Sequence, residues 1–246
     1  MKKLALTIAL IITVSVLFAQ HWNSKKTLGN GKIISKERAI PDFDALKVAG
    51  NFKVKITSER SGELSINTDE NLMEYIISEV EDGTLKIRMK KNYYLKPSNH
   101  KAVSIEIPMQ ALQLIALSGS GSIHSDEPIR SKSINTKMAG SGKINLNVET
   151  QEMSANLSGS GRIELQGSSQ EFEAKLAGSG SIWARTMKVN DSNLALSGSG
   201  RMIVNVSDRL KAQVSGSGSI RYEAKPSTEI VSKVTGSGSI KEIRNY

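Results

Sequence analysis

Hydrophobic and polar residues alternate with a period of two along much of the second half of the chain. Residues 144–148 read INLNV, and residues 172–176 read FEAKL. Successive side chains of a β-strand point to opposite sides, so this period is typical of a strand with one buried face. The pattern therefore predicts short strands throughout residues 117–246.

The tripeptide Gly-Ser-Gly interrupts this alternation seven times, at intervals of 21, 19, 19, 20, 18 and 20 residues. In each copy a hydrophobic residue stands two positions before the first glycine and two positions after the second. The repeat glycines are Gly119, Gly121, Gly140, Gly142, Gly159, Gly161, Gly178, Gly180, Gly198, Gly200, Gly216, Gly218, Gly236 and Gly238. A unit of about 20 residues is too short for helical-pair repeats, which need at least about 33 residues.

Short strands at this period predict an all-β fold, a right-handed parallel β-helix in which each repeat forms one rung. Parallel crossover connections are right-handed in nearly all proteins, which sets the expected hand. Stacked rungs lie about 4.8 Å apart, so seven rungs would form a rod about 35 Å long. Residues 117–246 are the seven-rung repeat region, and residues 42–246 are expected to form one continuous domain.

The Gly-Ser-Gly tripeptides are interpreted as corners of the β-helix. If Leu117 and Ile123 face inward, parity places Gly119 and Gly121 inward and Ser120 outward. Glycine suits such a corner because it tolerates positive φ and leaves space for a close backbone. A bend that shifts the parity would instead turn the serines inward. A phosphate-binding loop is the functional alternative, but it needs a following helix, which the strand pattern does not provide.

The residues before the repeat are expected to cap the rod. Residues 20–41 are polar and basic and are interpreted as a loose lead-in, and residues 42–116 as a cap with the first strands of the β-helix. Within the cap, residues 71–81 carry Leu72, Ile76 and Val80 at helical spacing, which predicts one short helix. Asp82-Gly83 then predicts a turn.

The N-terminal segment has the features of a signal peptide. Residues 1–19 combine Lys2 and Lys3 with an apolar stretch and end at Ala19. The apolar stretch is shorter than the roughly 20 residues that span a bilayer. We therefore expect cleavage near Ala19, no transmembrane segment afterwards, and a location in the periplasm, at the cell surface or outside the cell.

Composition argues against catalysis. The chain has no cysteine and three histidines, which excludes thiol chemistry and cysteine-ligated metals and leaves no recognisable metal or cofactor site. His124-Ser125-Asp126 contains the residue types of a catalytic triad, but neighbours along a strand point to opposite faces. No catalytic residue is therefore assigned.

One column of the predicted rod is basic. The residue after each Gly-Ser-Gly is Lys143, Arg162 or Arg201 in three rungs and serine in the others. These three residues are a candidate stripe for an anionic ligand such as an acidic glycan. The alternative is a solvated column that tolerates any polar residue. Nucleic acid is not expected as a partner, because export and the lack of interleaved aromatic residues disfavour it.

The chain resembles the "head GIN domain" family of putative auto-transporter adhesins. The resemblance rests on the V-x-G-x-F-x-V opening at residues 48–54, the I-x-I-P at residues 105–108 and the seven glycine rungs, and it extends from Asp42 to Ile243. It implies a secreted or surface β-helix of bacterial envelopes.

Together these features predict an exported, non-catalytic binding or adhesion scaffold of the cell envelope. Its partner would be an anionic glycan or another envelope protein. One alternative is a polysaccharide-degrading β-helix enzyme, which needs acids clustered across adjacent rungs. The acids between the glycines instead fall at varying offsets, namely Asp126, Glu149, Glu171, Asp191, Asp208 and Glu229. The other alternative is a self-assembling envelope protein, since little follows the last rung to cap it.

Overall fold

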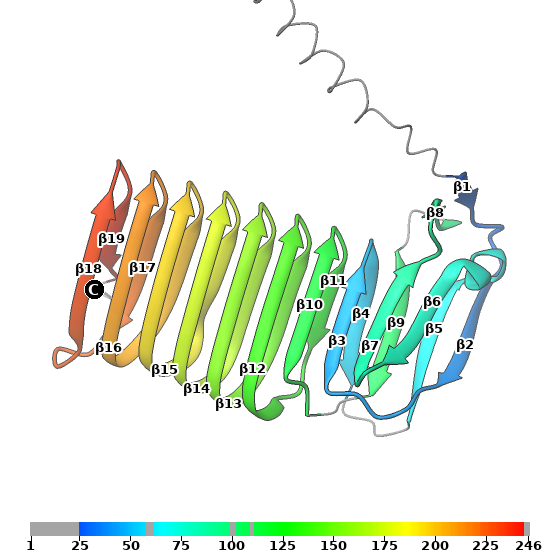
Figure 1. The fold of residues 1–246 in the computed structure, drawn as a ribbon, viewed down its shortest axis with the longest axis horizontal. Coiled ribbons are helices and arrows are strands. Elements are labelled where there is room, and N and C mark those ends of the chain that lie inside the picture. Colours follow the sequence, from blue (N-terminus) through cyan, green and yellow to red (C-terminus); the bar gives the residue numbers. More distant parts are fainter. Residues whose placement is uncertain (1–24, 58–61, 99–101, 109–110, 244–246) are drawn as a thin grey trace, which may run out of the picture.

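The alternating segments form strands that wind into a rod in the computed structural model, which describes residues 25–57, 62–98, 102–108 and 111–243 (Figure 1). The expected signal peptide lies outside these residues. In the described part of the chain no helix is long and apolar enough to cross a membrane.

Each rung is one turn of a β-solenoid, made largely by a single strand that bends halfway. The long strands are β12 (Ile129–Gly140), β13 (Lys143–Gly159), β14 (Arg162–Gly178), β15 (Ser181–Gly198) and β16 (Arg201–Gly216). The end rungs use shorter strands, β10 (Leu114–Gly119), β11 (Ser122–Ser125), β17 (Ser219–Ala224), β18 (Glu229–Thr235) and β19 (Ser239–Glu242). Pairing between successive rungs is parallel throughout.

The solenoid has two sheets joined at the Gly-Ser-Gly corners. We call the sheet whose strands lead into the corners the front sheet, and the sheet whose strands leave them the back sheet. In Figure 1 the front strands run upward, the back strands run downward, and the chain advances from right to left, so the turns are right-handed. The predicted fold class and hand are confirmed.

The hydrophobic positions beside the corners form two buried columns between the sheets. The front-sheet column is Leu117, Met138, Leu157, Leu176, Leu196 and Val214, each at most 3% exposed. The back-sheet column is Ile123, Ile144, Ile163, Ile182, Met202 and Ile220, each at most 1% exposed. The middle serine of every corner is exposed, which settles the parity in favour of outward serines.

The corners are held by backbone hydrogen bonds from one rung to the next. The first glycine of each corner has positive φ, and Gly178 is representative at 124°. The carbonyl oxygen of Gly159 accepts hydrogen bonds from the N–H groups of Ser179 at 3.1 Å and Gly180 at 3.0 Å. A side chain at these positions would meet the backbone of the preceding rung, so the repeat keeps glycine there.

An eighth, degenerate corner joins the solenoid to the cap. β3 (Ala45–Ala49) and β4 (Phe52–Thr57) pair in parallel with β10 and β11. Between them Gly50 has a φ of 129°, and its carbonyl accepts a 3.0 Å hydrogen bond from the N–H of Gly121.

Beyond this corner the pairing changes from parallel to antiparallel. β7 (Thr84–Met89) and β9 (Val103–Pro108) still pair in parallel with β3 and β4. β5 (Glu63–Asp69) and β6 (Ile76–Glu81) then pair antiparallel with β9 and β7. These antiparallel strands close the N-terminal end of the solenoid, as predicted for a cap.

The predicted short helix is present but covers only half of residues 71–81. A 3-10 helix, η1 (Glu70–Tyr75), is followed directly by strand β6. Asp82 and Gly83 have φ values of 48° and 68°, the conformation of a two-residue hairpin turn, and they reverse the chain into β7. This hairpin overrides the helical spacing of the apolar residues.

The polar segment 20–41 is more ordered than a loose lead-in. β1 (Lys25–Leu28) pairs with β8 (Tyr93–Lys96), and β2 (Ile33–Ala39) pairs antiparallel with β5. The half-buried Arg38 donates hydrogen bonds to the carbonyl oxygens of Ile76 at 2.9 Å and Met73 at 3.1 Å. The described part of this segment therefore belongs to the cap.

A buried carboxylate fastens the same segment. The side chain of Asp69 is fully buried and accepts hydrogen bonds from the N–H groups of Gly31 at 2.8 Å and Ser98 at 2.9 Å. Burial alone would raise the pKa of Asp69, but hydrogen bonds from Ser98 and Gly31 outweigh it and lower the pKa below its ordinary value.

Candidate ligand-binding grooves

The three predicted basic residues lie in one column on the back sheet, directly after the corners. The strand register places Lys143 beside Arg162, Arg162 beside Ser181, and Ser181 beside Arg201. They line a groove of about 540 Å³ that runs along the rod. We call it the corner groove, and its lining side chains are Ser141, Lys143, Ser160, Arg162, Ser179, Ser181, Trp183, Ser199 and Arg201.

Trp183 adds an aromatic surface that the sequence analysis missed. It is 37% exposed and lies in the column next to the basic one. The guanidinium of Arg162 lies over its ring, 4.1 Å from the centroid, which is the geometry of a cation–π contact. The indole is therefore held in place while part of it faces solvent.

One carboxylate reduces the charge of the groove. Glu164 forms ion pairs with Lys143 at 2.9 Å and with Arg162 at 3.5 Å. Arg162 also donates a 3.3 Å hydrogen bond to the hydroxyl of Ser181. Arg201 makes no ion pair within the described residues, so it is the cation most available to a ligand. In the same column Ser122 lies one rung before Lys143, and Lys53 lies one rung before Ser122. The basic column therefore extends toward the cap as far as Lys53.

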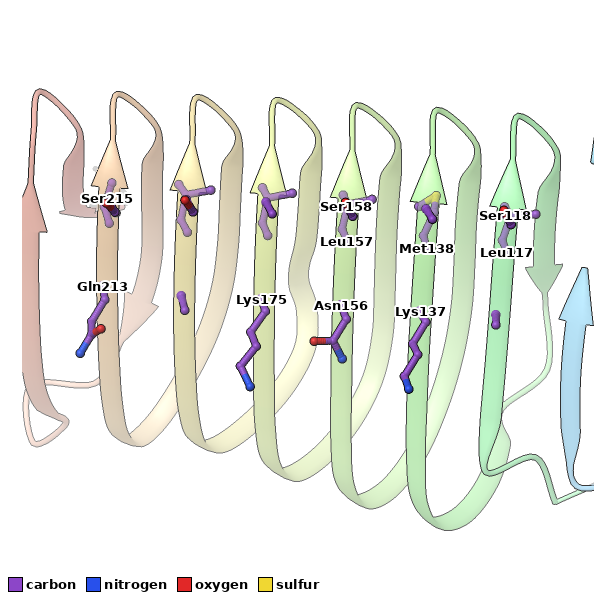
Figure 2. Close-up of a pocket in the computed structure, with 18 of the residues that line it drawn as sticks. Leu117, Ser118, Lys137, Met138, Asn156, Leu157, Ser158, Lys175, Gln213 and Ser215 are labelled. Atoms are coloured by element: carbon purple, nitrogen blue, oxygen red, sulfur yellow. The ribbon is translucent and has the colours of Figure 1, made fainter. Parts of the chain in front are cut away.

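A second groove of about 900 Å³ runs along the front sheet (Figure 2). One of its columns has small side chains, Ala49, Ser118, Ala139, Ser158, Ala177, Ser197, Ser215 and Thr235. The neighbouring column is Lys47, Ala116, Lys137, Asn156, Lys175, Ala195, Gln213 and Lys233. We call this surface the front groove.

The lysine column of the front groove contains no acid. Lys175 pairs with Glu173 of the adjacent column at 2.7 Å, whereas Lys47, Lys137 and Lys233 make no ion pair within the described residues. Each member stands three positions before the first glycine of a corner, so this constant spacing is the sequence signal that aligns the column. Sequence analysis missed the column because only four of its eight members are lysine, and the strand register confirms that they lie side by side.

Acids align across adjacent rungs at the opposite bend although their offsets from the corners vary, which corrects the expectation that they are not clustered. The register stacks Glu152 on Glu171 and Glu171 on Asp191, with Arg209 next. The offsets differ because the rungs differ in length, and β15 absorbs its extra residues in a bulge between Ala184 and Lys188. All three carboxylates are exposed to solvent.

His124, Ser125 and Asp126 do not form a triad. His124 and Asp126 lie on the outer face, with Nε2 of His124 2.6 Å from Oδ1 of Asp126. Ser125 is fully buried, and its hydroxyl accepts a hydrogen bond from the N–H of Asn147. Among the described residues no group of three or more His, Cys, Asp or Glu is placed to hold a metal ion.

The family profile described as "Putative auto-transporter adhesin, head GIN domain" matches residues 42–226. The chain belongs to this family. No curated protein matches it. The match begins just before the degenerate corner and ends between the sixth and seventh Gly-Ser-Gly tripeptides, so it includes all residues of the corner groove.

Solved structures of similar proteins share the fold of this head GIN domain chain. A putative adhesin from Bacteroides fragilis has a TM-score of 0.80 at 24% identity, covering 88% of this chain and 100% of its own. A putative lipid binding protein from Parabacteroides distasonis has a TM-score of 0.73 at 28% identity, covering 89% and 100%. A putative adhesin from Parabacteroides merdae has a TM-score of 0.71 at 23% identity, covering 89% and 99%.

Proposed function

We propose that this protein is an exported, non-catalytic binding scaffold of the bacterial cell envelope that binds an anionic glycan in the corner groove. The observation that carries the proposal is the arrangement of Trp183 between Arg162 and Arg201 on successive rungs. An indole, two cations and the neighbouring serine hydroxyls provide apolar contact, charge and hydrogen bonds along one line. Membership in a family of putative adhesins supports export and a binding role.

The repeat of the groove fits a linear polymer. Each rung advances the rod by about 4.8 Å and presents the same set of outward positions. A pyranose unit of an extended glycan advances by a similar distance, so successive sugars would meet equivalent serines. Arg162 and Arg201 lie two rungs apart, and an acidic group on every second sugar would match them. A neutral glycan would gain no such contact.

The geometry supports binding more than turnover. Glycoside-cleaving sites use a pair of carboxyl groups in which the acid has a raised pKa. The stacked carboxylates Glu152, Glu171 and Asp191 are exposed, and they lie at the bend rather than in the corner groove. We therefore keep the polysaccharide-degrading enzyme as the alternative that the experiment must distinguish.

The test is a binding panel of acidic and neutral linear polysaccharides with the purified protein. We expect binding to acidic members that weakens as salt is raised. Trp183→Ala and Arg201→Ala should each weaken it at least about tenfold, which corresponds to about 1.4 kcal/mol. The matched control is Arg130→Ala, because Arg130 is also exposed but pairs with Glu149 away from the groove.

Two results would contradict the proposal. Equal binding by the Trp183 and Arg130 variants would remove the corner groove as the site. Release of shortened polysaccharide would show that the protein is an enzyme.

The front groove favours a second candidate ligand, an anionic amphiphile such as a lipid. The lining of this groove is mainly apolar, and Lys137 and Lys233, which make no ion pair within the described residues, stand beside the small-residue column. The name of the Parabacteroides distasonis structure, a putative lipid binding protein, is consistent with this candidate. Vesicles with and without anionic lipid, added to the same panel, test it, and binding lost in Lys137→Ala but kept in Trp183→Ala would support it.

A further inference from the structure

The solenoid exposes its core at the end opposite the cap. Ile230 and Val234 of β18 continue the buried columns of Leu210 and Val214, with which they pair in register. Leu210 and Val214 are 0% and 2% exposed, whereas Ile230 and Val234 are 40% and 41% exposed. Two inward-facing positions therefore present apolar side chains to solvent at the last rung.

Among the described residues, the backbone at this end is also unpaired on one side. β18 pairs with β16, and β19 pairs with β17. Within the described residues no strand lies against the outer edges of β18 and β19. Such edges present free N–H and C=O groups that favour pairing with another strand. At the other end of the rod, the antiparallel strands of the cap cover the solenoid.

We propose that two copies of this chain join end to end through antiparallel pairing of their β18 strands, centred on Ser232. Antiparallel pairing about Ser232 places Ile230 opposite Val234 of the second copy, and the reverse pair forms by symmetry. All three residues lie on the inward face, so the pairing extends the core from one copy into the other. It buries the exposed apolar side chains and supplies hydrogen-bond partners for the free edge.

Charge on the outer face is compatible with the same register. Glu229 would lie diagonally across from Lys233 of the second copy, within reach of an ion pair. Because of the twofold symmetry, this ion pair would form twice in the dimer. Lys233 forms no ion pair within the described part of a single copy, while Glu229 already pairs with Arg209 at 3.2 Å. The outer face therefore contributes attraction rather than repulsion.

The assembly closes at two copies. Both partners use the same surface, so the interface is isologous and leaves no copy of this surface free for a third chain. Growth into a filament would require a free solenoid edge at the cap end, where the antiparallel strands lie instead. The expected product is a dimer with two caps at its outer ends.

Single cysteines test the register directly, because the natural chain contains none. Ser232→Cys lies on the symmetry axis, where facing Cα atoms are about 4.5–5.5 Å apart and suit a disulfide. The control Val231→Cys would face Lys233 of the second copy, so the two cysteines would be diagonal, about 7–8 Å apart and too far to bridge. Mild oxidation should cross-link the Ser232 variant alone. Cross-linking of the Val231 variant alone, or of neither, would overturn the pairing.

The mass in solution provides an independent test that does not depend on oxidation. Sedimentation of the purified protein from micromolar to millimolar concentration should show a dimer. Ile230→Lys should raise the dissociation constant at least about tenfold, whereas Val231→Lys, on the outward face of the same strand, should leave it within about threefold. A monomer at all concentrations, filaments, or equal effects of the two lysine variants would overturn the proposal. Circular dichroism checks that each variant is folded.

Discussion

Replacing Gly178 with alanine tests whether the corner glycines are required for folding. Gly178 begins a central corner and has a φ of 124°. A Cβ atom there would lie 2.5 Å from the carbonyl oxygen of Gly159. This oxygen accepts the hydrogen bonds from Ser179 and Gly180 that hold the two rungs together. The methyl group can therefore be accommodated only by moving an acceptor that is already used twice.

Two costs and one gain set the expected magnitude. A non-glycine residue in a sparsely populated backbone region costs about 1–3 kcal/mol. Overpacking against fixed atoms costs about another 1–3 kcal/mol. Lower entropy of the unfolded chain returns about 0.4–1 kcal/mol. We expect Gly178→Ala to lower the free energy of unfolding by about 3 kcal/mol.

Two other glycines separate the two costs. Gly31 has a φ of 85° and no atom within 4 Å of its Cβ position, so Gly31→Ala adds backbone strain alone. The Cβ position of Gly180 lies 2.5 Å from the oxygen of Gly161 without a positive φ, so Gly180→Ala adds overlap alone. Ser179→Ala is the neutral control, because this serine is exposed, and its effect should stay within about 0.5 kcal/mol.

Urea denaturation followed by circular dichroism measures all four variants. Gly178→Ala should be the least stable, with Gly31→Ala and Gly180→Ala between it and the serine control. Stability equal to that of the natural protein in Gly178→Ala would refute the assignment of the tripeptide to folding. It would also indicate that the repeat is retained for a surface role.

Two further predictions concern the cap. The folded-state pKa of Asp69 lies below the ordinary value of an aspartate because the buried carboxylate accepts hydrogen bonds from Ser98 and Gly31. Its contribution to stability is therefore complete above the ordinary pKa and is lost as pH falls through the folded-state pKa. Urea midpoints between pH 6 and pH 2 should fall less steeply in Asp69→Asn, and an unchanged slope would contradict the assignment. Arg38→Met should lower the free energy of unfolding by about 2 kcal/mol, because the carbonyl oxygens of Met73 and Ile76 lose a charged donor. Thermal melts that match those of a Lys36→Met control would contradict this expectation.

The solenoid could be predicted from sequence because its constraints repeat. Seven corners at intervals of 18 to 21 residues indicate the rung length, and the flanking apolar residues indicate which positions face inward. The parity counted from Leu117 and Ile123 oriented Ser120 correctly, and the structure decided against the alternative of inward serines. The cap has no such repetition, so each of its elements rests on a single local pattern. For residues 71–81 that pattern was ambiguous, and the hairpin at Asp82 and Gly83 decided it.

The grooves were only partly accessible from sequence. Lys143, Arg162 and Arg201 could be aligned because each directly follows a Gly-Ser-Gly corner, so differences in rung length do not change its position relative to that corner. Trp183 stands two positions further on and is the one tryptophan of residues 117–246, so no repeated pattern marks it. At the opposite bend the rungs differ in length, and counting from the corners failed to align Glu171 with Asp191. Alignment from sequence therefore loses accuracy with distance from the corner.

This loss follows from how the solenoid divides its positions. Inward columns and corner glycines are fixed by contacts with the rungs before and after, so they recur in every copy. Outward positions touch solvent and tolerate exchange, which is why one column reads lysine, arginine, serine and arginine over four successive rungs at Lys143, Arg162, Ser181 and Arg201. Residues that set a ligand preference must then lie in the columns that the repeat leaves free. For such a fold, recognition is encoded across rungs, at separations of about 20 residues, and the strand register is needed to find it wherever the rungs differ in length.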